Sequence, residues 1–243
     1  MSKDKILIIG ASSDIGLDLI RNIDQDALII AHYNSSHRDL EDLLSQIDQE
    51  SVMIKADLSI EKETVAMVDS IEKNYGIPNK IIHLPAPKFE NIRFKDIELN
   101  NFQNDLEVCL KSLIIILNKF LPKLSKGQQG KVVCMLSSVV LNKPPKALAQ
   151  YTIIKYALLG LVKSLASEYS DKNIQINAIS PSMCETKFLN SLNDKLVELS
   201  AYNNPNKRNA VVGDITPIIK MLISSKSDYI SGVNIPVTGG SIF

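Results

Sequence analysis

Three side chains in the second half of the chain have the chemistry of a proton-transfer site. Ser138 follows an apolar run, and Tyr151 and Lys155 are separated by one helical turn. On a helix this spacing places both side chains on one face. A positive ammonium near a phenol favours the phenolate, so such a tyrosine can exchange a proton with a substrate. A strand-end serine can hydrogen-bond the same substrate oxygen. Taken alone, however, a tyrosine and a lysine at this spacing are also typical of plain surface helices.

A glycine-bounded segment near the start of the chain is a candidate phosphate site. The apolar run Lys5–Ile9 meets Gly10, and Gly16 lies within the helical pattern that follows. Backbone N–H groups and the helix dipole at such a junction face an anion. Gly10 permits the tight turn, and Gly16 lets the helix pack close to the sheet. The spacing differs from the three-glycine dinucleotide fingerprint. A capped strand-to-helix turn without a ligand is therefore the alternative.

The segment after the second apolar run bears on the choice between two nicotinamide cofactors. Enzymes that use NAD usually carry a carboxylate there, which holds the ribose 2′-hydroxyl. No carboxylate follows Ala31 until Asp39. Hydroxyl groups, His37 and Arg38 can instead accept a 2′-phosphate. The segment favours NADP(H) over NAD(H), and a polar loop that caps the next helix is the alternative.

Short apolar runs alternate with longer helical patterns, which is typical of a parallel sheet covered on both faces. The predicted strands are Lys5–Ile9, Ala27–Ala31, Val52–Lys55, Lys80–Leu84, Lys131–Leu136, Ile174–Ile179 and Val233–Val237. The predicted helices are Ile15–Ile23, Arg38–Ile47, Lys62–Tyr75, Phe102–Leu124, Gln150–Tyr169 and Asp214–Ser224. Right-handed crossovers give a doubly wound α/β fold of the Rossmann type, with about seven parallel strands. No linker divides the chain, so we expect a single domain over residues 1–243.

The least regular part of the chain lies between Pro181 and Gly213 and is rich in Asn, Ser and Lys. A long irregular insertion after a late strand is a candidate mobile lid over a site. We expect this lid near residues 183–212. We also expect it to contain the residues that select the substrate.

Bulk composition argues against several classes of protein. Hydrophobic residues make up 45% of the chain, and 27 basic residues balance 27 acidic ones. This balance gives no footprint for nucleic acid. Cys109, Cys134 and Cys184 form no CxxC pair, which predicts reduced thiols rather than a disulfide framework or a metal site. No apolar stretch is long enough for a membrane span or for a signal peptide. We therefore expect a cytoplasmic protein.

Together, these motifs resemble the short-chain dehydrogenase/reductase family along nearly the whole chain. The resemblance is closest to the branch of 3-oxoacyl-(acyl-carrier-protein) reductases. Gly10–Gly16 stands where the family has TGxxxGxG, and Ser138, Tyr151 and Lys155 fall on the catalytic serine and the YxxxK pair. Asn177–Ser182 is similar to the NxxxPG segment, and Ser231–Gly240 is similar to the closing strand and its double glycine.

The resemblance implies a role for each matching position. NADPH delivers a hydride to a carbonyl carbon, and Tyr151 donates a proton to the carbonyl oxygen. Ser138 orients and polarises that oxygen, while Lys155 binds the nicotinamide ribose. Asp57 matches the aspartate that contacts adenine, and Thr186 matches the threonine that holds the carboxamide. The predicted cofactor-binding residues are Gly10, Ser12, Ser13, Asp14, Ile15, Gly16, Tyr33, Asn34, Ser35, Arg38, Asp57, Leu58, Pro85, Tyr151, Lys155, Pro181, Ser182 and Thr186.

Three positions depart from the family pattern. Asp14 replaces a glycine, and a carboxylate near a pyrophosphate is repulsive unless it points away or lies in the first helical turn. The segment from His83 to Ala86 replaces NNAG, and Pro85 within it lacks an N–H donor. Cys109 replaces an asparagine that helps to hold a water behind the lysine. A thiol is a weak hydrogen bonder, so this position is either a changed relay or a small buried residue.

The preferred prediction is an NADP(H)-dependent reductase of a ketone, with a 3-oxoacyl thioester favoured, either free or on a carrier protein. One alternative is a nucleotide-binding scaffold or sensor with little catalysis. Another is a reductase of a sugar or other polar carbonyl, because the lid contains Lys187, Asn190, Asn193, Asn203 and Asn204.

Two of the predicted helices carry more apolar surface than one sheet face needs. The residues concerned are Leu113–Leu117 and Leu158–Val162. The resemblance implies that these helices form a dimer face. We therefore expect a homo-oligomer, namely a tetramer, although full burial within the domain is the alternative.

Overall fold

The strands of the protein form one parallel sheet. The computed structural model describes residues 3–23, 26–124, 126, 129–190 and 192–243. The strands are β1 (Asp4–Ile9), β2 (Ala27–Tyr33), β3 (Ser51–Lys55), β4 (Lys80–His83), β5 (Gly130–Met135), β6 (Ile174–Pro181) and β7 (Asn234–Val237). Their order is β3-β2-β1-β4-β5-β6-β7. The order reverses between β1 and β4, and ligands bind at such a switch point in doubly wound sheets. The predicted fold class is confirmed.

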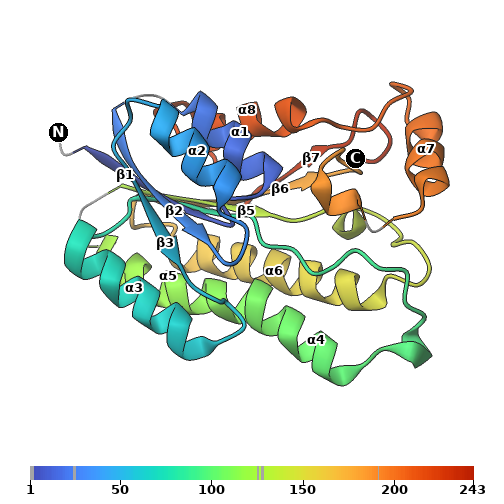
Figure 1. Ribbon diagram of the computed structural model, residues 1–243, viewed down its shortest axis with the longest axis horizontal. Helices are drawn as coiled ribbons and strands as arrows, with labels where there is room; N and C mark the ends of the chain where they lie inside the picture. The colour runs from blue at the N-terminus through green and yellow to red at the C-terminus, as the bar shows by residue number, and fades with distance from the viewer. Residues whose placement is uncertain (1–2, 24–25, 125, 127–128, 191) are drawn as a thin grey trace.

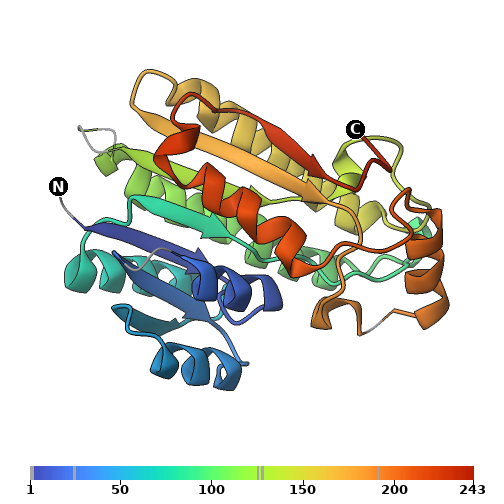
Figure 2. The same ribbon diagram turned by 90° about the horizontal axis from the view of Figure 1, so that it is seen from above.

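Helices cover both faces of the sheet (Figure 1). One face is covered by α1 (Asp14–Asn22), α2 (Arg38–Gln46) and α8 (Val212–Leu222), and Figure 2 looks onto this face. The other face is covered by α3 (Glu61–Tyr75), α4 (Leu99–Leu106), α5 (Ser112–Leu124) and α6 (Ala149–Glu168). The remaining helix, α7 (Asp194–Asn203), lies beside the carboxyl ends of the strands (Figure 1).

The apolar core consists of one layer on each side of the sheet. Along β1, the side chains of Leu7 and Ile9 belong to the layer under α5 and α6, whereas Ile6 and Ile8 belong to the layer under α1 and α8. A strand that is buried on both faces needs apolar residues at every position. This requirement explains why the second half of β1, from Ile6 to Ile9, is an unbroken apolar run. Among the described helices, none has the length and apolar character needed to cross a membrane.

The lid segment is more regular than the sequence predicts. Residues Lys187–Leu189 form a short 3-10 turn, and Asp194–Asn203 form α7, whose first turn is capped by the side chain of Asn193. No residue of α7 is buried, and its larger apolar side chains Leu196, Leu199 and Tyr202 are exposed, so the helix lacks the core-facing stripe by which helices are predicted. Ser191 of the predicted lid, and Met1 and Ser2 of the predicted domain, lie outside the described residues.

The long helix predicted over Phe102–Leu124 is interrupted. It begins earlier, at Leu99, and a π-helical turn at Glu107–Lys111 separates α4 from α5. The Ser112 hydroxyl donates to the Val108 carbonyl oxygen at 2.6 Å beside this turn. A π-helical turn inserts one residue into the helix and occurs frequently at functional sites. Cys109 lies inside it and is fully buried.

Candidate active site

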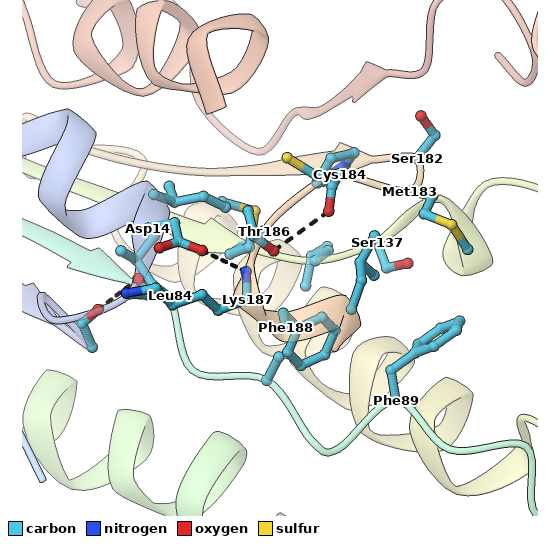
Figure 3. A pocket seen from close by; sticks show the side chains of 18 of the residues that line it. Asp14, Leu84, Phe89, Ser137, Ser182, Met183, Cys184, Thr186, Lys187 and Phe188 are labelled. Carbon is cyan, nitrogen blue, oxygen red and sulfur yellow. Dashed lines mark hydrogen bonds between the residues drawn. The ribbon is translucent and has the colours of Figure 1, made fainter. Parts of the chain in front are cut away.

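A cleft of about 1220 Å³ opens at the carboxyl ends of the strands (Figure 3). Its walls include Gly10 after β1, Ser35 after β2, Leu84 after β4, Ser138 after β5 and Ser182 after β6. The cleft therefore spans the switch point of the sheet. Its volume exceeds the roughly 300–1,000 Å³ that is usual for a site holding one small ligand. There is room for a dinucleotide and a second molecule.

The predicted catalytic residues all line this cleft. Ser138 begins a short 3-10 turn after β5, and α6 packs against that turn. Tyr151 and Lys155 lie one turn apart on α6. Tyr151 is 6% exposed and Lys155 is fully buried. The spacing argument made from the sequence therefore agrees with the geometry, because both side chains reach the same wall.

Lys155 has the environment of a functional lysine rather than a surface lysine. Its Nζ donates to the carbonyl oxygen of Met135 at 2.9 Å and lies 5.7 Å from the centre of the Tyr151 ring. Burying an ammonium is costly unless acceptors surround it. An ammonium carries three N–H donors, and within the described part of the chain the Met135 carbonyl oxygen is its one hydrogen-bond acceptor. Two donors are thus available for hydroxyl groups of a ligand in the cleft.

The glycine turn presents the start of α1 to the cleft. The Ser13 hydroxyl donates to the Gly10 carbonyl oxygen at 2.8 Å and accepts from the Gly16 N–H at 3.1 Å, which caps the helix. Gly10 has a positive φ of 79°. A Cβ atom at Gly16 would lie 2.5 Å from the carbonyl oxygen of Ala11. Both glycines are therefore required by the backbone, as the sequence predicts.

Asp14 lies in the first turn of α1, in the lining of the cleft. Its carboxylate does not point away from the site. It accepts a hydrogen bond at 2.6 Å from the backbone N–H of Lys187 in the lid (Figure 3). The helix dipole favours a negative charge at this position. The carboxylate thus joins the glycine turn to the lid.

His32 is a structural residue of the site that sequence reasoning missed. Its Nδ1 accepts from the Gly10 N–H at 3.1 Å, so Nε2 carries the proton and donates to the Ala56 carbonyl oxygen at 3.0 Å. Burial lowers the pKa of His32, although the hydrogen bond to Ala56 opposes this effect. The neutral ring holds the glycine turn against the ends of β2 and β3. The sequence feature that could have identified His32 is its place near the end of an otherwise apolar strand.

The predicted cofactor residues divide into two groups. Those in the cleft lining are Gly10, Ser12, Ser13, Asp14, Ile15, Ser35, Arg38, Tyr151, Lys155, Pro181, Ser182 and Thr186. The described lining of the cleft does not include Gly16, Tyr33, Asn34, Asp57, Leu58 or Pro85. Hydrogen bonds from the Ser59 side chain and backbone lower the pKa of Asp57, and burial opposes them. Leu58 is part of the core. Binding by either group stays a prediction.

Two aromatic residues next to Tyr151 were not predicted. Phe89, in the loop after β4, packs edge-on against the Tyr151 ring with 5.1 Å between centroids. Phe188, in the lid, lies 6.3 Å from Phe89. These two rings form an apolar part of the cleft wall (Figure 3). Their only signal in the sequence was their position in segments that follow strand ends.

Two departures from the family pattern are buried beneath the site. Burial, followed by the charge of Lys155, lowers the pKa of His83 to about 3. Both ring nitrogens of His83 lack a hydrogen-bond partner among the described residues. Burial raises the pKa of the Cys109 thiol to about 12, so this position fits the small buried residue considered above. In the described part of the chain, no cluster of three metal-ligating side chains is present.

Known proteins resemble this chain over nearly its full length. The family model described as enoyl-(acyl carrier protein) reductase matches residues 10–241. The 3-oxoacyl-(acyl-carrier-protein) reductase of Buchnera aphidicola is 25% identical, covering 98% of this chain and 97% of its own. The enzyme of the same name from Staphylococcus aureus is 26% identical, with 96% of each chain covered. A solved gluconate 5-dehydrogenase from Burkholderia cenocepacia, in complex with NADP and tartrate, has a TM-score of 0.88 at 19% identity, covering 99% of this chain and 96% of that one.

Proposed function

The chain belongs to the short-chain dehydrogenase/reductase family of nicotinamide-dependent oxidoreductases, and on this basis we propose that it is an NADP(H)-dependent reductase that converts a ketone to an alcohol. The observation that carries the proposal is the wall formed by Ser138, Tyr151 and the fully buried Lys155, in one cleft with the glycine turn. Burying an ammonium is costly, so a buried lysine in a cleft is a candidate functional residue.

Each residue of the wall has a defined task in this reaction. The bound cofactor supplies the hydride that adds to the carbonyl carbon. The Tyr151 hydroxyl donates a proton to the carbonyl oxygen, and the Ser138 hydroxyl hydrogen-bonds the same oxygen. The two free N–H donors of Lys155 bind ribose hydroxyls, and its charge stabilises the phenolate that remains. Phe89 packs edge-on against the phenol ring and shields part of it from water.

The end of β2 supports a preference for NADP(H). Ser35, Ser36, His37 and Arg38 line the cleft there. The first carboxylate, Asp39, is engaged by the ammonium of Lys187 at 2.5 Å. This arrangement supplies hydroxyl and cationic donors for a phosphate and leaves no unpaired carboxylate for a ribose hydroxyl.

The substrate that we favour is a 3-oxoacyl thioester, either free or on a carrier protein. The apolar wall of Phe89 and Phe188 suits an alkyl chain better than a sugar. Two of the lid asparagines that suggested a sugar substrate already make hydrogen bonds within the protein. Asn193 caps α7, and the Asn204 side chain donates to the Thr238 carbonyl oxygen at 3.0 Å. The curated relatives are also named for 3-oxoacyl reduction.

The proposal is tested by NADPH consumption with a 3-oxoacyl thioester, a 2-enoyl thioester and a sugar ketone. We expect the first substrate to be preferred. We expect Tyr151→Phe to lower kcat by about 100-fold or more, the usual worth of a positioned proton donor, with little change in the NADPH Kd. Tyr229→Phe, at a fully exposed position outside the described cleft lining, is the matched control. NADPH binding without reduction of any carbonyl would establish the nucleotide-binding scaffold instead.

We also propose a cytoplasmic homotetramer. Ile114 of α5 and Ile153 and Tyr156 of α6 are 43%, 45% and 45% exposed. Apolar side chains gathered on two neighbouring helices suit a face between subunits. The cysteines are free among the described residues, which suits a reducing compartment.

A further inference from the structure

We propose that Lys187 of the lid selects NADP(H) by charge, and that Asp39 holds its ammonium beside the 2′-phosphate position until the cofactor binds. The inference rests on the proposed function, because it assigns a specificity-determining residue to the same cleft. It concerns a residue outside the glycine turn and outside the β2 segment.

Lys187 joins three elements that are distant in the sequence. Its backbone N–H donates to the Asp14 carboxylate at 2.6 Å, at the start of α1 (Figure 3). Its Nζ donates to Asp39 Oδ2 at 2.5 Å, in the first turn of α2. All three residues line the cleft. The first contact fixes the backbone of the lid, and the second holds its ammonium against the first turn of α2.

In the proposed complex, this ammonium is close to the 2′-phosphate. Asp39 follows Arg38 directly, and in the proposed complex Arg38 and Ser35 face the adenosine ribose. Lys187 and Asp39 line the same cleft, so the ammonium can turn from Asp39 toward that ribose. Until the cofactor binds, Asp39 occupies the ammonium.

The pair between Lys187 and Asp39 is suited to displacement by a ligand. Their side chains are 68% and 59% exposed, and ion pairs this exposed are weak. The hydrogen bond from Lys187 lowers the pKa of Asp39, with a smaller contribution from Arg21, so the carboxylate is charged. A phosphate monoester carries a charge of about −1.5 to −2 and three acceptor oxygens, compared with −1 for the carboxylate. The ammonium therefore moves to the phosphate, whereas a 2′-hydroxyl offers it no such replacement.

The same contact connects cofactor choice with the substrate wall. Phe188 follows Lys187 in the 3-10 turn, and its ring lies 6.3 Å from that of Phe89, which packs against Tyr151. A 2′-phosphate that holds Lys187 thereby also holds Phe188 beside Phe89.

The test measures binding of two cofactor fragments by calorimetry, so it does not depend on turnover. Adenosine 2′,5′-bisphosphate carries the 2′-phosphate, and AMP lacks it. We expect Lys187→Gln to weaken the bisphosphate about tenfold or more, as the loss of one charge-assisted contact predicts, and to leave AMP within about twofold. We expect Asp39→Asn to keep or strengthen bisphosphate binding, because the competing carboxylate is gone. Lys195→Gln, at an exposed position in the same lid, is the control.

A second measurement uses the whole cofactors. We expect Lys187→Gln to shift the ratio of the NADPH and NADH dissociation constants toward NADH by about tenfold, and Asp39→Asn in the same chain to reverse part of this shift. An unchanged ratio of bisphosphate to AMP affinity in Lys187→Gln, or an equal loss in Lys195→Gln, would overturn the inference. Either result leaves the proposed ketone reduction intact, because that is judged by Tyr151→Phe and turnover.

Discussion

Replacement of His83 by leucine, combined with mild acid, tests whether the imidazole beneath the site is held neutral. His83 ends β4 and is fully buried, and burial lowers its pKa to about 3 from an ordinary 6.5. Below about pH 6.5 the unfolded chain binds a proton that the folded chain refuses. Stability is therefore fully present above the unfolded pKa and is lost as the pH falls toward 3.

The expected magnitude follows from this shift. One pKa unit corresponds to about 1.36 kcal/mol. Between pH 7 and pH 5, the His83 term therefore removes about 2 kcal/mol from the free energy of unfolding. This window ends above the ordinary pKa of carboxyl groups, so carboxylates contribute little to the change. The lowered pKa of His32 acts in the same direction, but it is present in both proteins and cancels in the comparison.

The assay is urea unfolding at pH 7 and pH 5 for the wild type, His83→Leu and the control His37→Leu, which alters an exposed side chain. We expect the wild type and the control to lose about 2 kcal/mol more than His83→Leu. At pH 7 we expect His83→Leu to be at least as stable as the wild type, because it removes two buried polar atoms without partners. Equal losses in the wild type and His83→Leu would refute the reasoning.

Two further predictions concern packing and assembly. Gly16→Ala should lower the free energy of unfolding by about 2 kcal/mol or more and weaken NADPH binding, because its Cβ would meet the Ala11 backbone at 2.5 Å. Gly213→Ala in α8, where a Cβ meets nothing within 4 Å, should raise the free energy of unfolding by up to about 1 kcal/mol. Urea unfolding of both variants and of the wild type measures these changes. Ile153→Glu on α6 should give monomers by light scattering, whereas Val65→Glu on α3, also exposed, should not. A wild type that is already monomeric, or an Ile153→Glu protein that stays assembled, would contradict the proposed subunit face.

Local patterns made much of the fold predictable. Strands such as β1 are buried on both faces, so their apolar runs are continuous. The spacing of Tyr151 and Lys155 is a property of one helix and does not depend on the rest of the fold. By contrast, α7 was missed because it buries no residue, and the π-helical turn at Glu107–Lys111 was missed because periodicity does not reveal a single inserted residue.

The features of the site that were not predicted from the sequence depend on contacts between distant segments. The hydrogen bond from Lys187 to Asp14 joins residues 173 positions apart. The contact of Phe89 with Tyr151 likewise joins a loop to a helix from another part of the chain. Residue type and spacing identify groups that can react. They do not identify which loop side chain will lie beside those groups, because that depends on tertiary packing.

The ring of His32 also affects how the nucleotide turn responds to acid. A neutral imidazole accepts on one nitrogen and donates on the other, so a single side chain ties the Gly10 amide to the Ala56 carbonyl. A protonated ring would lose its acceptor and push that amide away. Because burial keeps the pKa of His32 below its ordinary value, the turn retains this pair of hydrogen bonds at a lower pH than an ordinary imidazole would allow. The architecture that receives the nucleotide is thereby buffered against the mild acidification to which imidazoles usually respond.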